Sequence, residues 1–172
     1  MKRILVLAAM IVTMFCGYGQ CAEFVQLNDD IGMLTIVQRY NEAIGADNWE
    51  YQVSTYFSEC NDTIVPYTTT YQSVNLSHAK FYCSVNGAGL VVCYAVFAPK
   101  YGTSSYMIER IATAMLYSIA PLAYDDVKDT IKRFSSGETM QVSFIANNRK
   151  FVIDRDSYNR DFCYVMIHAE SV

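Results

Sequence analysis

Apolar residues recur at helical spacing in three segments of the chain. Gly45 follows the first segment as a terminator, Ser104 or Ser105 can cap the second, and Pro121 ends it. The third segment opens with two acidic residues, which suit a helix start because they can cap it and because the helix dipole is positive there. The pattern predicts amphipathic helices that carry the apolar positions of residues 33–44, 107–119 and 127–134.

From Trp49 onward, Tyr, Thr, Val and Phe dominate and Asn, Pro and Gly interrupt them, which is typical of strands joined by turns. Strands are predicted at residues 51–59, 68–74, 78–85 and 90–97. After the third helix, alternating residues predict strands at 140–146 and 150–153, and a last strand at 162–168. Residues 154–161 form either a charged loop or a continued exposed strand.

The expected order is one helix, four strands, two helices and two or three strands. Such segregation indicates the α+β class: an antiparallel sheet of about five to seven strands, with the N-terminal helix and the mid-chain helix pair packed on one face. No repeat, low-complexity tract or linker interrupts the pattern. Residues 23–172 are therefore predicted to form a single domain.

A hairpin turn is predicted where Asn86-Gly87-Ala88-Gly89 separates two apolar runs, because these residues tolerate positive backbone angles. A three-residue loop would place Cys83 opposite Cys93 and favour a disulfide between them. A different loop length would separate these two residues. A bridge from one of these strands to Cys60 or Cys163 is the alternative.

A basic start, Met1-Lys2-Arg3, precedes a mostly apolar run at residues 4–15. That run is shorter than the roughly 20 residues of a membrane span and suits the core of a signal peptide. Small residues then allow cleavage between Gly19 and Glu23. We predict a signal peptide over residues 1–22 and a secreted or periplasmic mature chain without a transmembrane segment.

The composition, 52% hydrophobic and 17% charged, is that of a globular domain. Removal of the signal peptide takes away two basic residues and no acidic one, which shifts the net charge from −4 to −6. An acidic surface disfavours nucleic acid and anionic membranes, since both are negatively charged. A protein, a peptide or a saccharide is the expected partner.

The cysteine content of the mature chain indicates disulfides. Because exported chains are oxidised, four cysteines in the mature part are predicted to pair: Cys60, Cys83, Cys93 and Cys163. A zinc site is not expected, since there is no Cys-x2-Cys pair and the two histidines lie far apart in sequence. No metal or other cofactor is predicted.

Catalytic chemistry has few candidates in this sequence. His78 and His168 are the only possible histidine bases, and no Gly-x-Ser-x-Gly turn presents a serine. The segment 154–161 begins Asp-x-Asp but lacks the glycine and glutamate of a calcium loop. A small exported hydrolase that uses these acids with His168 is the alternative function. The sequence favours a protein that is not an enzyme.

Aromatic and acidic residues gather between Tyr40 and Ala79, a stretch without Lys or Arg. Tyrosine and tryptophan offer large contact areas with little entropy loss, and acids attract cationic groups. The leading hypothesis is therefore a non-enzymatic binding module; a core role for the aromatics and a subunit of an envelope or surface assembly are the alternatives. The candidate binding residues are Trp49, Glu50, Tyr51, Tyr56, Glu59, Tyr67 and Tyr71.

The order of elements resembles a known type of protein. A helix with the sequence VQRYNEAIG at residues 37–45 precedes the predicted sheet, and a later helix runs into APLAYDDV at residues 120–127 before a closing hairpin. In this pattern the mature chain resembles small, largely uncharacterised exported bacterial α+β proteins. The resemblance implies export and an α+β fold, and it transfers no catalytic or binding residue.

The signal-peptide prediction is tested by expressing the full chain in an export-competent bacterial host. We expect the intact mass of the protein recovered outside the cytoplasm to correspond to cleavage between Gly19 and Glu23. Recovery of the chain at its full-length mass, or in the cytoplasm alone, would contradict this prediction.

Overall fold

The computed structural model describes residues 24–61, 64–73, 79–99, 103–157 and 162–172. The described residues form an antiparallel sheet of eight strands together with helices, which confirms the α+β class. The sheet is larger than the five to seven strands predicted. The additional strand is the two-residue β1, too short to leave a periodic signal in the sequence. The predicted signal peptide lies outside the described residues.

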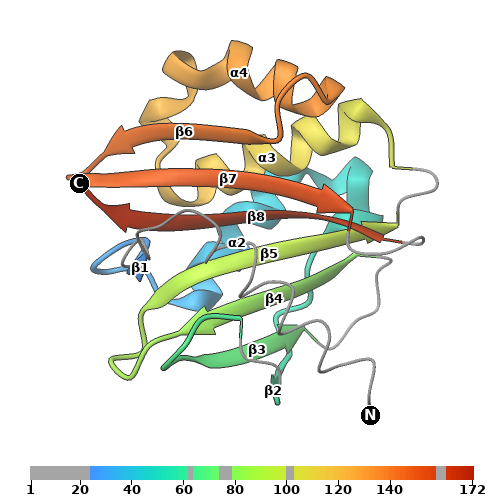
Figure 1. Ribbon diagram of the computed structural model, residues 1–172. Helices are drawn as coiled ribbons and strands as arrows, with labels where there is room; N and C mark the ends of the chain where they lie inside the picture. The colour runs from blue at the N-terminus through green and yellow to red at the C-terminus, as the bar shows by residue number, and fades with distance from the viewer. Residues whose placement is uncertain (1–23, 62–63, 74–78, 100–102, 158–161) are drawn as a thin grey trace.

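The strands follow the order β2-β3-β4-β5-β8-β7-β6, and β1 adds to β8 (Figure 1). Strands β2 and β6 are therefore the two terminal strands of this path. In chain order the elements are β1 Phe24–Val25, α2 Met33–Ile44, η1 Ala46–Tyr51, β2 Phe57–Cys60, β3 Thr69–Ser73, β4 Lys80–Val85, β5 Val91–Pro99, α3 Ser105–Ile119, η2 Pro121–Ala123, α4 Tyr124–Ser136, β6 Gln141–Ala146, β7 Arg149–Ser157 and β8 Phe162–Ser171.

The helices begin and end largely as the sequence indicates. Gly45 ends α2 with φ of +86°, and the Ser104 hydroxyl caps α3 by accepting a 3.2 Å hydrogen bond from the Met107 N–H. In α4, Asp125 and Asp126 do not cap: they stand exposed in the first turn, where the dipole still favours acids. Among the described residues, no helix is both long and apolar enough to cross a membrane.

The strand predicted at residues 51–59 is wrong in its first half, because a 3-10 helix, η1, continues to Tyr51 and β2 begins only at Phe57. Asn41 of α2 explains the difference. Its amide nitrogen donates to the Val53 carbonyl and its amide oxygen accepts from the Val53 N–H, each over 2.8 Å. A helix side chain thus satisfies the backbone groups that a neighbouring strand would otherwise have to bind.

The hairpin of β4 and β5 has the predicted turn but only part of the predicted register. Val85 lies opposite Val91 as expected, whereas Ser84 lies opposite Cys93. Val92 is therefore an extra residue, a β-bulge in β5. Because side chains alternate along a strand, this single residue changes which side chains share a face.

The predicted disulfide between Cys83 and Cys93 is not formed, for this reason. Cys83 packs between the sheet and the helices, while Cys93 packs on the opposite face, and a disulfide requires the two Cβ atoms to face each other. Cys60 lies on the terminal strand β2, and Cys163 lies opposite Ala98. Within the described part of the chain, no disulfide joins any two of these four cysteines.

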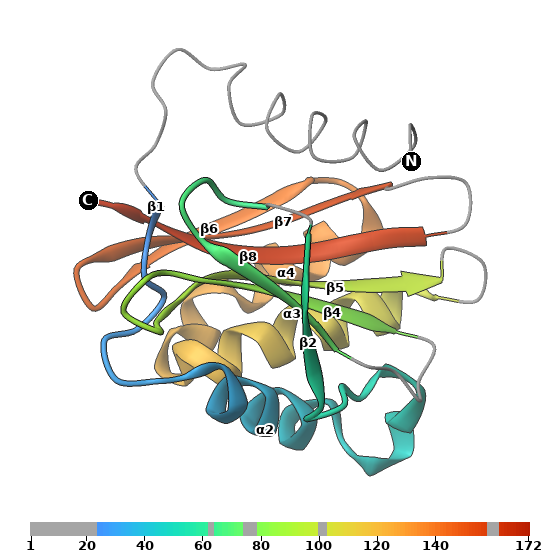
Figure 2. The same cartoon turned by 90° about the horizontal axis from the view of Figure 1, so that it is seen from below.

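Strand β5 is buried on both sides, and every residue from Val91 to Ala98 is buried. On one side, the side chains of α2, α3 and α4 pack with those of the sheet in the larger core, and Figure 2 shows α2 and α3 below the sheet. We call the other side the open face. In the described part of the chain, the smaller cluster on this face contains no helical residue and consists of Ile64, Val65, Val92, Cys93, Ala95, Phe97 and Met166.

Tyr94 joins β5 to α3. Its ring stacks on that of Phe81, with centroids 5.1 Å apart. Its hydroxyl donates to the Met115 carbonyl over 3.1 Å and also contacts the Ser118 hydroxyl. All of these groups are buried, so the hydroxyl of Tyr94 fixes the helix against the sheet without exposing a polar atom.

Tyr94→Phe should lower the free energy of unfolding by about 1 kcal/mol, because it removes a buried hydrogen bond at constant shape. Urea unfolding measures the change. Tyr117→Phe is the matched control, since Tyr117 lies on the same helix with an exposed ring, and it should change stability by less than about 0.5 kcal/mol. Equal effects of the two substitutions would contradict the role of Tyr94.

Candidate functional site

Three aromatic side chains are exposed on the chain that leads into and out of the terminal strand β2. Trp49 of η1 is 57% exposed, Tyr56 just before β2 is 76% exposed, and Tyr67 beyond β2 is fully exposed. Glu50 and Glu59 are exposed as well. We call these five residues the β2 surface.

The other two predicted binding residues have different surroundings. Tyr51 is half-buried against the larger core, where its hydroxyl lies 3.4 Å from that of Thr103 and its carbonyl accepts from Tyr40. Tyr71 is half-buried on β3, directly opposite Glu59. Tyr51 therefore has a structural role, whereas Tyr71 lies beside the β2 surface.

Tyr67 is exposed because of the turn that carries it. Its φ is +62°, which places it in the left-handed region, and the Thr68 hydroxyl closes the turn by donating to the Val65 carbonyl over 2.6 Å. The same turn places the side chains of Ile64 and Val65 on the open face of the sheet. One short segment thus both covers part of the open face and presents an aromatic ring to solvent.

A histidine with two carboxylates lies on β7 and β8. His168 is 2% exposed; its Nδ1 is 3.5 Å from Asp154 Oδ2, and its Nε2 is 3.4 Å from Glu170 Oε1. Glu170 also binds Lys150 over 2.8 Å, and the Phe24 ring of β1 meets the imidazole edge-on at 4.9 Å. The hydrolase hypothesis requires His168 to lie near an acid of the segment 154–161. The structure places one such acid, Asp154, beside it.

Burial dominates the proton affinities in this cluster. It raises the pKa of Asp154 to about 6, and the charge of Glu170 adds to the effect. Burial also lowers the pKa of His168, although Glu170 acts in the opposite direction. For Glu170, burial alone would raise the pKa, but hydrogen bonds from Lys150 and His168 outweigh it and hold the pKa below its ordinary value. Near neutral pH the imidazole is therefore uncharged.

The thiol that the register places beside this histidine is not activated. Cys93 lies opposite His168 in the register, but it is fully buried, and burial raises the pKa of its thiol to about 11. A thiol with so high a pKa is a poor nucleophile. His78, the other candidate base, lies outside the described residues.

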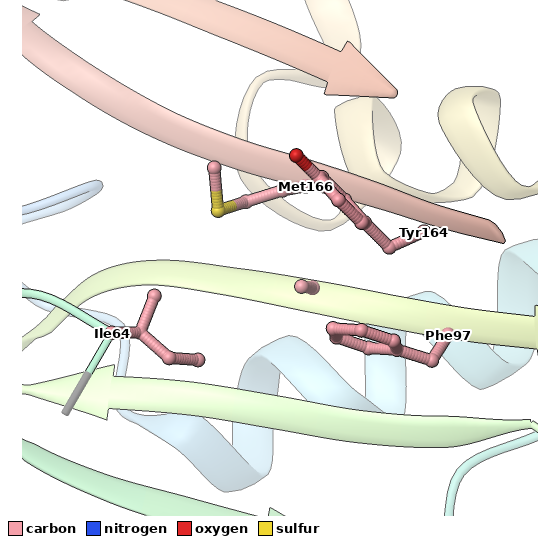
Figure 3. A pocket seen from close by; sticks show the side chains of 5 residues that line it. Ile64, Phe97, Tyr164 and Met166 are labelled. Atoms are coloured by element: carbon pink, nitrogen blue, oxygen red, sulfur yellow. The ribbon is translucent and has the colours of Figure 1, made fainter. Parts of the chain in front are cut away.

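An aromatic row crosses the open face from β4 to β8. The rings of Tyr82 and Phe97 meet edge-on at 5.0 Å, and those of Phe97 and Tyr164 lie 5.6 Å apart. Beside this row is a small hollow above Ala95, with a cavity volume of about 10 Å³ (Figure 3). That volume fits one water-sized group, whereas pockets for metabolites measure roughly 300 Å³ or more. The hollow therefore does not suit a substrate-sized molecule.

Sequence reasoning missed the open-face hollow. Its lining comes from distant parts of the chain, namely Ile64, Ala95, Phe97, Tyr164 and Met166. The pairing of β5 with β8 brings four of these residues together, and the segment between β2 and β3 adds Ile64. In the described residues, no group of three or more His, Cys, Asp or Glu side chains could hold a metal ion.

Comparison of the chain with protein-family models, with curated proteins and with solved structures finds no match. The functional interpretation therefore rests on the geometry of the chain itself.

Asp154→Asn should stabilise the protein at neutral pH. The pKa of Asp154 is about 6 in the folded protein and 3.8 in the unfolded chain. The folded protein therefore has its full free energy of unfolding below about pH 4, where the acid is protonated in both states, and it loses part of that free energy as the pH rises through about 6. The substitution removes that loss and should add about 2 kcal/mol to the free energy of unfolding at about pH 7.5. It should add almost nothing at about pH 4.

Urea unfolding at both pH values measures this difference. Asp129→Asn, on the exposed side of α4, is the matched control and should change stability little at either pH. Destabilisation by Asp154→Asn at about pH 7.5 would mean that Asp154 forms an ion pair with a protonated His168, and would contradict the assignment.

Proposed function

We propose that this protein is an exported, non-enzymatic binding module whose partner contacts the β2 surface. The observation that carries the proposal is the exposure of Trp49, Tyr56 and Tyr67 on segments that adjoin one terminal strand. Large aromatic side chains dominate the binding energy of protein interfaces when a partner buries them. Exposing several of them close together in the chain favours binding over a role in the core.

The charge of this region supports a cationic protein or peptide as the partner. Glu50 and Glu59 accompany the aromatic rings, and residues 41–79 contain no Lys or Arg. Electrostatic complementarity raises the rate of association and disfavours acidic partners. Strand β2 also ends the sheet path, and within the described residues β3 is its only pairing partner. An extended segment of a partner could add to such an edge.

The two alternatives have weaker support. A hydrolase based on His168 and Asp154 is disfavoured because the imidazole is buried and the adjacent thiol of Cys93 has a raised pKa. An assembly subunit is favoured by β6, a terminal strand without a charged residue that contains the exposed Ile145 and follows the exposed Met140. However, α4 runs alongside β6 in Figure 1, and a helix beside an edge strand protects it from pairing.

Affinity capture by the purified mature protein tests the proposal. Trp49→Ala should reduce capture of a specific partner by about thirtyfold, as expected for a central aromatic anchor. Glu50→Lys and Glu59→Lys should reduce it by smaller factors through charge repulsion. Quantitative mass spectrometry of the captured proteins measures the loss relative to the unsubstituted chain.

Two controls alter equally exposed residues away from the β2 surface. Leu122→Ala removes an apolar side chain from η2, and Asp126→Lys reverses a charge on α4. Both should leave capture unchanged. If the three test variants capture as much as the unsubstituted protein, or if the controls lose as much as they do, the β2 surface is not the binding site.

A further inference from the structure

Strand β2 has one backbone edge that no other described strand covers. It pairs with β3 alone, with Phe57 opposite Ser73 and Glu59 opposite Tyr71. Among the described residues, no backbone hydrogen bond other than those of this pairing involves Phe57, Ser58 or Glu59. In an antiparallel strand, alternate residues direct their N–H and C=O groups to opposite neighbours. The outer edge of β2 therefore carries donors and acceptors for a further strand.

The two terminal strands of the sheet path differ in how they are protected. Figure 1 shows α4 alongside β6, whereas β2 lies at the opposite end of the sheet. Natural edge strands are often blocked by lysine or proline, and β2, with the sequence FSEC, has neither. Its protection is its length of four residues. Backbone bonds alone would hold a partner weakly on so short a strand, so side chains must add to them.

Strand β2 is fixed in place before any partner arrives. Phe57 packs against the larger core, and its ring meets that of Phe81 edge-on at 6.0 Å. The Tyr56 N–H donates to the Ser54 hydroxyl over 3.1 Å, which sets the entry of the chain into the strand. An edge that is ordered in advance costs a partner less conformational entropy than one that must form on binding.

The charge at this edge selects a cationic occupant. Glu59 is exposed and lies two residues after Phe57, so both side chains are on the helix side of the sheet. Lys80 of β4 lies opposite Phe97 and therefore on the open face, two strands away from β2, so it does not neutralise Glu59. A second copy of the chain would bring its own Glu50 and Glu59 to the edge, and like charges oppose such pairing. Charge therefore favours a segment with lysine or arginine over a second copy.

We infer that β2 binds an extended, cationic segment of a partner protein as an additional antiparallel strand, with a lysine or arginine of that segment opposite Glu59. A residue two positions away in the segment then lies opposite Phe57 and is apolar, since alternate residues share a face. The exposed rings of Tyr56 and Tyr67, which flank β2 in the chain, provide contact area that the short strand lacks. This inference rests on the proposed function, because it places the partner on the β2 surface, and it adds the way in which the partner binds.

Amide NMR of the intact mature protein tests the inference. The probe is a capped heptapeptide, Thr-Val-Thr-Lys-Thr-Val-Thr, titrated to millimolar concentration. Its lysine and valines share one face when it is extended. It should shift the amide signals of β2 in a saturable way, and alternate amides of β2 should exchange about tenfold more slowly when it is bound. Contacts between side chains alone would not slow exchange in this alternating pattern.

Two N-methylated versions of the peptide identify the contribution of the backbone. One carries N-methyl groups on the valine and lysine residues, and the other carries them on the two central threonine residues. Because alternate N–H groups point to opposite edges, one version should lose at least about tenfold in affinity and the other should bind like the parent peptide. If the two versions bind equally, the partner contacts side chains only; the inference is then overturned, and the proposed function is not.

Charge variants test the residue opposite the lysine. Replacing the lysine of the peptide by glutamate should weaken binding by about tenfold, and Glu59→Gln should weaken binding of the lysine peptide by about threefold. Glu42→Gln, at an exposed position of α2, is the matched control and should leave binding unchanged. Equal binding of the lysine and glutamate peptides, or equal effects of the two substitutions, would overturn the inference.

Two further outcomes would also overturn it. One is slower exchange of the β2 amides when the protein concentration alone is raised, which means that a second copy fills the edge. The other is the absence of any shift with the lysine peptide. Neither outcome decides the proposed function, which the capture experiment with Trp49→Ala tests separately.

Discussion

The two-sided burial of β5 is the constraint on which the rest of the structure depends. A strand buried on both faces must be covered twice, and its backbone groups must all be paired with neighbouring strands. Strands β4 and β8 provide the pairing. On one side Tyr94 fixes α3 by way of Met115 and Ser118. Among the described residues, the other side is covered by Ile64 and Val65 and by side chains of the sheet itself.

This asymmetry separates the roles of the two faces. The helix side is a continuous core to which α2, α3 and α4 contribute, and it serves stability. The open face combines apolar residues with polar and charged ones, among them His168, Asp154 and Glu170. Its small cluster is completed by a turn that also exposes Tyr67. The chemistry that could serve recognition is therefore outside the helix-covered core, either on the open face or around the terminal strand β2.

The features that depend on local sequence could be predicted. Helix periodicity, the stop at Gly45 and the cap at Ser104 were predicted correctly, because each is decided within a few residues. The strand predicted at residues 51–59 failed because a distant side chain, that of Asn41, binds the backbone there. The pairing of Cys83 with Cys93 failed because of the bulge at Val92, which no turn signal reports.

The same distinction between local sequence and distant contacts applies to the candidate site residues. Trp49, Tyr56 and Tyr67 could be chosen from composition, and the structure exposes all three. Tyr51 could not be distinguished from them, because its contact with Thr103 joins residues far apart in the chain. The contact of His168 with Asp154 and the hollow above Ala95 likewise depend on the register of β8 with its two neighbours.

Amide hydrogen exchange, followed residue by residue, tests the central role of β5 most directly. We expect the amides from Tyr94 to Val96 to exchange only through global unfolding, with protection equal to the full free energy of unfolding. The terminal strand β2 should exchange by smaller local openings, since it pairs on one side among the described residues. Exchange in β5 as fast as in β2 would contradict the central role of β5, because the strand that organises both faces would then not be the most stable part of the fold.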